Sequence, residues 1–434
     1  MDRWNALKTL TNERGVALPM ALITLVLLTT LMLAFAVLSQ TEPVIAANQL
    51  RTSQARALAE SGFEYAVWAL GNGNTPIGVA RPAGTLANPL PSSPAPAPFD
   101  GNTFTVFGTT GGFIVTVAND PGGDPDQRQI TSIGWTPTND PTDTHTKAHR
   151  KIQANVVSVP NLASRAPCAL CVAGELSVGG HAAINGTNTD PKCGGDDKYG
   201  TYTSGTTTMD GSATVTGGAG GIAQNQGMSA FNNFTFSNAT LDRLKDLARK
   251  NGTYFGPGFS GAASSVDGTA CPTGATTKPG CASTGAAYDG SVHFTNGNQV
   301  ANGVVFIDTT DGVNLAPSGT DVSTLADLRV DGNPFSAGDF SGYLIVNGTL
   351  TISGNMAING LVYAVNDFTY NGTGTGAING LAVSRNIRDT SATSIDSDSG
   401  GNSRVNFNCA NTAAPQLSGY AFGLVKGTYR ELAD

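Results

Sequence analysis

Six cysteines are the residues of this 434-residue chain best suited to covalent chemistry. An even number of cysteines in an exported chain is typical of disulfide bonds. All of them lie beyond residue 160, and they are Cys168, Cys171, Cys193, Cys271, Cys281 and Cys409. Cys271 and Cys281 enclose a loop rich in glycine, proline and threonine and are candidates for a local pair, but the connectivity stays open.

A metal site built on these cysteines is the weaker interpretation. Cys168-Ala-Leu-Cys171 could supply half of a zinc site, but no second motif of this kind follows, and the four histidines are scattered. The motif does not attach haem either, because Val172 stands where haem attachment requires histidine.

Three carboxylates gather in the turn at residues 119–126, which joins two expected strands. Asp120, Asp124 and Asp126 offer hard oxygen ligands at a density that suits calcium. Aspartate, asparagine, glycine and proline are also the ordinary residues of tight turns, and the twelve-residue calcium loop is absent. Calcium binding is therefore a candidate property, and no other cofactor is expected.

Catalysis has little support in the motifs. The chain has no nucleophile elbow, phosphate-binding loop or zinc-protease motif. Paired carboxylates would suit a carbohydrate hydrolase or lyase. The candidates are Asp308, Asp311, Asp321, Asp327 and Asp331. Several of them sit in glycine-rich turns, and aromatic residues that could floor a sugar groove make up only 7% of the chain. We expect that the protein is not an enzyme, and a net charge of −8 gives no indication of nucleic-acid binding.

The N-terminal region indicates how the chain is attached to a membrane. Residues 16–38 form a run of 23 residues without a charge, long enough as a helix to cross a hydrocarbon core of about 30 Å. This run is longer than the apolar part of a signal peptide, and no small-residue cleavage site follows it. The notable junction precedes it, at Glu13-Arg14-Gly15-Val16-Ala17-Leu18. An ordinary signal anchor is the alternative.

This junction, together with the polar helix expected from residue 54, resembles the class III leader of type IV pilins and type II secretion pseudopilins. It is most similar to minor pilins of the PilX type and to the K-type pseudopilins. The resemblance is specific over residues 10–70 and loose over 100–157. It implies cleavage by the prepilin peptidase between Gly15 and Val16, methylation of the new N-terminus, and assembly with other pilin or pseudopilin subunits. Most pilins carry glutamate where this chain has Met20, which implies a minor or tip-located subunit.

The resemblance also implies an order of elements that the patterning supports. Apolar residues from Ala55 to Leu70 recur at helical spacing, and residues 71–74 end the helix. Pro43 is expected to kink this helix. Strand patterns follow at residues 103–107, 112–118, 129–134 and 147–159. The predicted divisions are a leader (1–15), a pilin-like helix (16–75, membrane-spanning over 16–38), a proline-rich linker (76–100), a small antiparallel sheet (101–159) and a β-domain (160–434).

The β-domain is rich in glycine, threonine and asparagine. Short alternating segments recur between Asn-Gly pairs at 347, 359, 371 and 379, which suit either hairpins or the corners of a parallel solenoid. The fold class is therefore α+β, with a β-solenoid or sandwich as the large domain. One helix is expected at 238–251, with Thr240 as its N-cap and its charges on a solvated face.

Two functions fit this organisation. The first is a minor pilin-like subunit of a type IV pilus or pseudopilus. It would be anchored in the bacterial inner membrane by a single span, with its remaining domain in the periplasm, and would then join a cell-surface pilus. There it would present a disulfide-stabilised β-domain, at the tip, for assembly priming or adhesion to a surface or carbohydrate ligand. The second is a membrane-anchored exported protein that binds or acts on carbohydrate.

Overall fold

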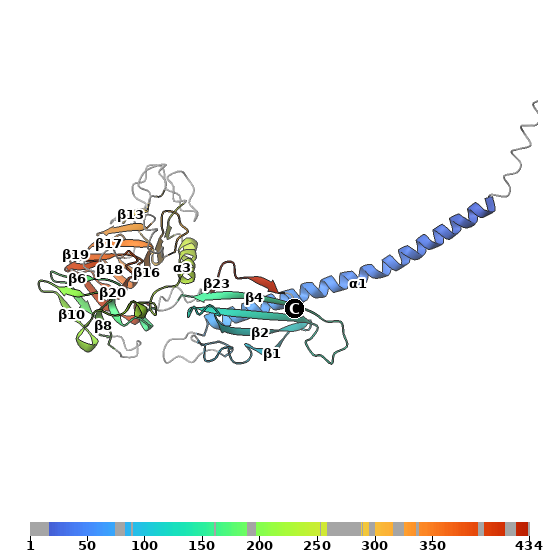
Figure 1. Ribbon diagram of the computed structural model, residues 1–434, viewed down its shortest axis with the longest axis horizontal. Helices are drawn as coiled ribbons and strands as arrows, with labels where there is room; N and C mark the ends of the chain where they lie inside the picture. Colours follow the sequence, from blue (N-terminus) through green and yellow to red (C-terminus); the bar gives the residue numbers. More distant parts are fainter. Residues whose placement is uncertain are drawn as a thin grey trace, which may run out of the picture.

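The computed structural model describes residues 17–73, 83–87, 90–159, 162–188, 197–251, 253–257, 288, 290–294, 300–315, 325–335, 338–388, 395–412 and 422–432. They form a long helix, an antiparallel sheet packed on its C-terminal part, and a large β-domain at the end of the molecule far from the helix N-terminus (Figure 1). The predicted combination of a long apolar helix and a large β-rich domain is confirmed.

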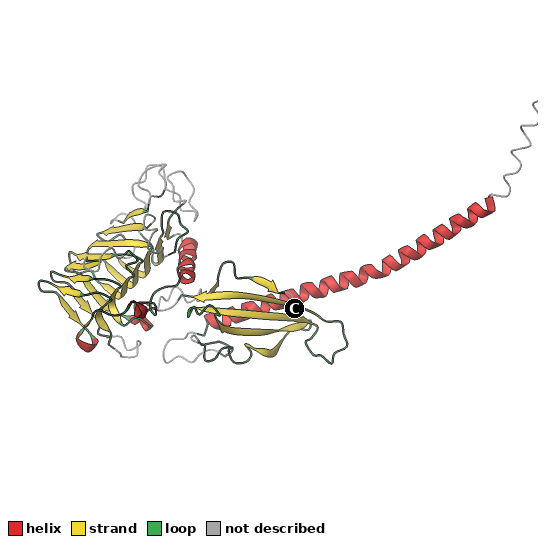
Figure 2. Cartoon of the chain, in the orientation of Figure 1, coloured by secondary structure: helices red, strands yellow, loops and turns green. Residues whose placement is uncertain are grey.

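The long helix is α1 (Ala17–Gly71), with 55 residues. It passes through Pro43 without interruption, so the expected kink is a gradual curve in the ribbon (Figure 2). Its C-terminal part contributes a stripe of buried alanines and larger apolar residues to a core shared with the sheet. The close approach needs glycine opposite the helix, because a methyl group on Gly134 would lie 2.1 Å from the carbonyl oxygen of Ala55.

The antiparallel sheet consists of β1 (Asp100–Phe107), β2 (Gly111–Asn119), β3 (Gln127–Thr136) and β4 (Ala148–Ser158), in that spatial order. All four predicted strands are confirmed. Alternate residues of β3 and β4 are buried, as expected for a sheet with one face on a helix.

Two strands from the C-terminus complete this sheet. Both β23 (Phe422–Leu424) and β24 (Arg430–Leu432) pair antiparallel with β4. The predicted boundary of the β-domain at residue 434 is therefore wrong, because residues 422–432 return to the sheet. The β-domain is an insertion between β4 and β23 (Figure 1).

The β-domain contains two large sheets in which every described strand pair is parallel. One sheet has the spatial order β13-β15-β17-β19-β21-β6-β9. Its strands are β13 (Ser291–Phe294), β15 (Ala326–Asp331), β17 (Gly348–Gly354), β19 (Phe368–Gly372), β21 (Ser397–Gly401), β6 (Leu176–Val178) and β9 (Thr207–Met209).

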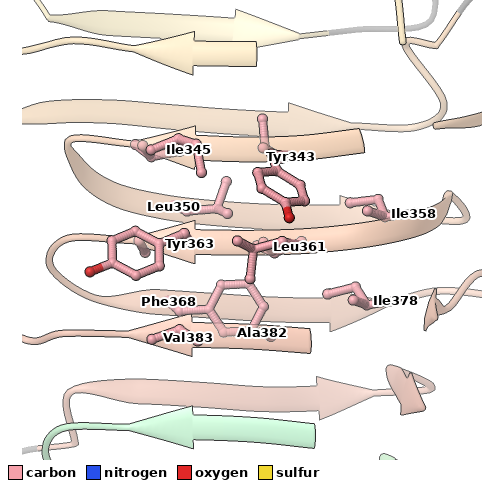
Figure 3. Packing of buried hydrophobic residues seen from close by; sticks show 14 of the residues in the cluster. Tyr343, Ile345, Leu350, Ile358, Leu361, Tyr363, Phe368, Ile378, Ala382 and Val383 are labelled. Atoms are coloured by element: carbon pink, nitrogen blue, oxygen red, sulfur yellow. The ribbon is translucent and has the colours of Figure 1, made fainter. Parts of the chain in front are cut away.

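The other sheet contains the remaining strands of the domain. They are β5 (Cys168–Val172), β7 (Ala183–Asn185), β8 (Tyr199–Thr203), β10 (Thr214–Thr216), β11 (Ile222–Ala223), β12 (Tyr254–Phe255), β14 (Gly303–Ile307), β16 (Asp339–Val346), β18 (Ala357–Ala364), β20 (Ile378–Ser384) and β22 (Arg404–Phe407). From β13 to β22 consecutive strands of the chain alternate between the two sheets, so each turn of the chain there adds one coil to a stack. Buried residues from both sheets form one continuous core, part of which is shown in Figure 3.

The chain does not wind from one end of the stack to the other. It starts in the middle with β5, follows β8 and β11 to one end, and crosses to the opposite end at β12. It then winds back through β14, β16, β18 and β20, where β20 pairs with β5. The chain therefore enters and leaves the stack at the same level, next to the antiparallel sheet.

The crossing segment contains α2 (Met228–Phe231) and α3 (Asn238–Asn251). It packs on the outer side of β12, β14 and β18, and the short helix α4 (Cys409–Thr412) packs on β16, β18 and β20, so the strands from β14 to β20 are buried on both faces. Phe236 contacts the Tyr363 ring, with ring centroids 4.7 Å apart, and α3 packs on β12 and β14. We call residues 228–251 the strap.

The helix predicted at 238–251 is confirmed with the same bounds, but Thr240 is not its N-cap. The Ser237 hydroxyl accepts a hydrogen bond from the Thr240 backbone N–H at 3.2 Å, so Ser237 caps the helix. A final short helix, α4 (Cys409–Thr412), follows β22, and single turns of 3-10 helix occur at Leu162–Ser164 and Gly218–Gly220.

Candidate functional site

The N-terminal half of α1 is the largest exposed apolar surface in the described part of the chain. Large side chains from Leu18 to Leu38 are roughly half to three-quarters exposed, and this half makes no contact with the sheet. Among the described residues, α1 is the one helix long and apolar enough to cross a membrane. A surface of this size needs a lipid or protein covering.

The polar side chains in this span are internally satisfied. The hydroxyls of Thr24, Thr29 and Thr30 each donate to the carbonyl oxygen four residues earlier, at 2.9–3.0 Å. Such bonds let threonine face an apolar environment without an unpaired hydroxyl. Beyond the span, Val44, Ile45 and Leu50 continue the exposed apolar surface towards the sheet.

An open groove of about 550 Å³ lies where α1 leaves the sheet. It is lined on the helix side by residues from Ile45 to Arg56 and on the sheet side by Arg150 and Glu431. Arg150 Nε lies 3.3 Å from Glu431 Oε1, which ties β4 to β24 at this point. The groove is mixed in polarity and contains no nucleophile with a base beside it.

The predicted processing site, Gly15 and Val16, lies outside the described residues. Met20, which replaces the usual pilin glutamate, is 66% exposed on α1. The described part of this span, residues 17–38, contains no acidic side chain.

The cysteines are only partly within the described residues. Cys168 begins β5 and Cys171 lies inside it, and the two cysteines form a disulfide. Cys409 is also disulfide-bonded, and its partner lies outside the described residues. Cys193 and the pair suggested for Cys271 and Cys281 also lie outside them. The described cysteines are thus all oxidised, which suits an exported domain.

The three aspartates proposed for calcium contact different groups. Asp120 accepts a hydrogen bond from Asn155 Nδ2 at 2.7 Å, and Asp124 accepts one from Gln127 Nε2 at 2.7 Å. Asp126 is buried and lies 2.6 Å from Arg165 Nη2. No group of three metal-ligating side chains occurs among the described residues. Calcium binding at this turn stays a prediction that the observed contacts do not support.

The candidate carbohydrate carboxylates are also dispersed. Asp308 is fully buried, and Asp311 closes its own turn by accepting hydrogen bonds from Val313 and Asn314 backbone N–H groups. Asp331 lies 2.7 Å from His293 Nε2 and 3.0 Å from Arg329 Nε on an exposed sheet face, where Asp327 also lies. Asp321 lies outside the described residues. No pair of these carboxylates shares a cleft in the described structure.

The arrangement of Asp308 was not expected. Its carboxylate makes an ion pair with Lys245 of α3, and the two side chains are 0% and 4% exposed. Tyr254 O–H donates to Asp308 Oδ2 at 2.8 Å. Burial, followed by the nearby Asp308 charge, raises the pKa of Tyr254, so its hydroxyl stays protonated. The prediction that all charges of α3 lie on a solvated face is therefore wrong for Lys245.

Three contacts join the β-domain to the antiparallel sheet. Arg165, just after β4, pairs with Asp126. Lys426, between β23 and β24, lies 3.1 Å from Asp242 and 3.3 Å from Asp246 of α3. The Arg243 side chain lies against the Gly423 backbone. The strap thus contacts both the coil stack and the sheet (Figure 1).

Comparisons with known proteins give little further information. No protein-family model matches the chain, and no curated protein matches it. Among solved structures, it is similar to the competence-associated pilin ComZ from Thermus thermophilus. The identity is 15% and the TM-score 0.23, over 88% of this chain and 96% of that chain. A TM-score this low does not establish a common fold, and the assignment of function rests on the geometry of this chain.

Proposed function

We propose that this chain is a minor pilin-like structural subunit of a type IV pilus or related pseudopilus. The observation that carries the proposal is the division of α1 into two halves. The N-terminal half is apolar and exposed, and the C-terminal half is buried against an antiparallel sheet. A helix of this kind can leave the bilayer and become covered by helices of other subunits without refolding the domain that it carries.

Each part of the chain then has a defined location before and after assembly. Before assembly, residues 16–38 span the bacterial inner membrane and the C-terminal part of the chain is periplasmic, where disulfides form. The prepilin peptidase removes residues 1–15, and the mature subunit then joins the surface fibre. With Met20 in place of glutamate, we propose a minor or tip position.

In this proposal the β-domain is a parallel β-solenoid that projects from the pilin-like core. Its support is the alternation of consecutive strands between two parallel sheets from β13 to β22. The domain lies beyond the end of α1 that packs on the sheet, so it would point away from the membrane (Figure 2). We propose that it serves assembly priming or adhesion and has no catalytic role, because Asp308 is buried and the remaining described aspartates of that group are dispersed.

The experiment that tests the function is N-terminal sequencing combined with fibre isolation. The mature protein should begin at Val16, with a methylated amine, and should appear in fibres sheared from the cell surface. The matched control is Gly15→Leu, which should keep residues 1–15 and remain in the membrane fraction. A mature protein that begins at Met1 and never appears in the fibres contradicts the proposal.

A further inference from the structure

The strap meets the coil stack in a cluster from which solvent is excluded. Lys245 projects from α3, and Asp308 follows β14 directly. Burying both charges carries a desolvation cost that their mutual attraction offsets only in part. By contrast, Lys426, a lysine from outside the strap that reaches α3, is 58% exposed in its ion pairs with Asp242 and Asp246.

The two oxygens of the Asp308 carboxylate have different surroundings. Oδ1 accepts hydrogen bonds from the Thr309 backbone N–H at 2.9 Å and from Asn347 Nδ2 at 3.3 Å. Two N–H donors on one oxygen are the arrangement that stabilises negative charge on a tetrahedral intermediate. Oδ2 instead contacts two groups that carry protons, Lys245 Nζ and the Tyr254 hydroxyl. One oxygen is therefore stabilised in place, and the other is surrounded by proton donors.

We propose that Lys245 and Asp308 condense into an intramolecular isopeptide bond. The Nζ–Cγ bond forms and the Cγ–Oδ2 bond breaks. The ammonium nitrogen loses two protons, and both leave with Oδ2 as one water molecule, with the Tyr254 hydroxyl relaying one of them. The reactants carry one positive and one negative charge, and the products are neutral, so no oxidant, reductant or further reactant is needed.

The surroundings favour the neutral product. Condensation removes two buried charges and with them the desolvation cost. The new amide N–H retains a buried acceptor, because Lys245 Nζ already donates to the Gly312 carbonyl oxygen. The amide oxygen, formerly Oδ1, retains its two N–H donors. Holding amine and carboxyl in contact also converts a slow bimolecular reaction into a unimolecular one.

The bond would fasten the strap to the stack. Lys245 lies 63 residues before Asp308 in sequence, and α3 also contacts the sheet through Arg243 and the aspartates that bind Lys426. Covalent attachment at Lys245 would keep this connector seated when the subunit is under load. The inference does not depend on the proposed function, since the bond forms or fails within the single chain.

Mass spectrometry of tryptic peptides from the full-length protein, reduced and alkylated, tests the bond. Trypsin cuts after Arg243 and Arg249 but not after a lysine whose amine is in an amide. We expect a branched peptide that joins residues 244–249 to the peptide containing Asp308, lighter than their sum by one water. Complete cleavage after Lys245, with no branched peptide, overturns the proposal.

Lys426 supplies the matched control, because it also contacts aspartates but in water. It should be cleaved normally, and a comparable branch from Lys426 would overturn the role given to burial.

Tyr254→Phe keeps the ring and removes the hydroxyl, so the protein should fold. Its branched fraction, measured soon after synthesis, should form at least about tenfold more slowly. An unchanged rate would overturn the relay assigned to Tyr254.

Discussion

Gly360 lies beside Gly342 in the register of β18 and β16, and a methyl group on Gly360 would lie 1.9 Å from the Gly342 carbonyl oxygen. Gly303 and Gly380 continue the same column on either side. At this column the strands pass from one side of the coil to the next, and the backbones approach too closely for any side chain. The stacking of the coils that contain β14, β16, β18 and β20 therefore depends on glycine at this position.

Gly360→Ala should lower the free energy of unfolding of the β-domain by about 3 kcal/mol, since the neighbouring backbone must move. Gly338→Ala is the control, because its φ of +83° is unfavourable for alanine but no atom lies within 4 Å. It should cost only about 1 kcal/mol. Urea unfolding followed by tyrosine fluorescence measures both, because the three tryptophans, at positions 4, 68 and 135, lie outside the β-domain. Equal effects would contradict the stacking argument.

Phe422→Ala should destabilise the antiparallel sheet by about 3 kcal/mol, since Phe422 is 6% exposed in the core shared by α1 and the sheet. Leu424→Ala, two residues later on the same strand, should change stability by less than about 0.5 kcal/mol because Leu424 is 50% exposed. Trp135 fluorescence during urea unfolding reports on the sheet. If both variants behave like the wild type, the C-terminal strands are not part of the sheet core.

Leu28→Lys should release the protein from membranes. Leu28 lies in the middle of the uncharged span, and a lysine at the centre of a membrane helix costs about 3 kcal/mol. Leu50→Lys changes an equally exposed leucine of the same helix beyond the span and should leave the protein membrane-bound. The fraction retained after alkaline carbonate extraction measures the difference. Retention of Leu28→Lys at the wild-type level would count against a bilayer-spanning role.

Asp126→Asn should change how stability depends on pH. Burial raises the pKa of Asp126, although Arg165 opposes the shift. The folded state therefore takes up a proton at a higher pH than the unfolded state, so this group favours folding increasingly as pH falls through its folded pKa. The wild type should gain stability relative to Asp126→Asn as pH falls from 7 to about 4. A difference in unfolding free energy that is constant with pH would contradict the shift.

The sequence predicted the helices and strands whose formation depends on residues close together in the chain. Helical spacing from Ala55 to Leu70 and the alternation in residues 112–118 were sufficient for α1 and β2. Gly71 and its neighbours marked the end of α1 for the same reason. These features depend on residues within one or two turns of each other, which a single sequence displays directly.

Other features depend on partners that are distant in sequence. Asn359 and Asn379 precede glycines and were interpreted as turn residues, but both lie inside strands. Asn379 Nδ2 donates to Asn359 Oδ1 at 3.2 Å, and Asn406 Nδ2 donates to Asn379 Oδ1 at 3.0 Å. Such a ladder pairs the hydrogen-bonding groups of asparagine side chains on neighbouring coils. It can be recognised only when the register of the strands is known. Lys245 was placed on a solvated face because nothing near it in sequence indicates Asp308.

The return of the C-terminal strands imposes an order on biosynthesis. The Asn155 backbone N–H donates to the Thr428 hydroxyl, 273 positions later, at 3.0 Å. While the ribosome makes the inserted domain, β4 has an unpaired edge that is open to wrong partners. The coil stack brings its two connections to the same level, so its completion holds the last strands beside β4. A chain whose stack is misfolded would thus be left with an unfinished sheet.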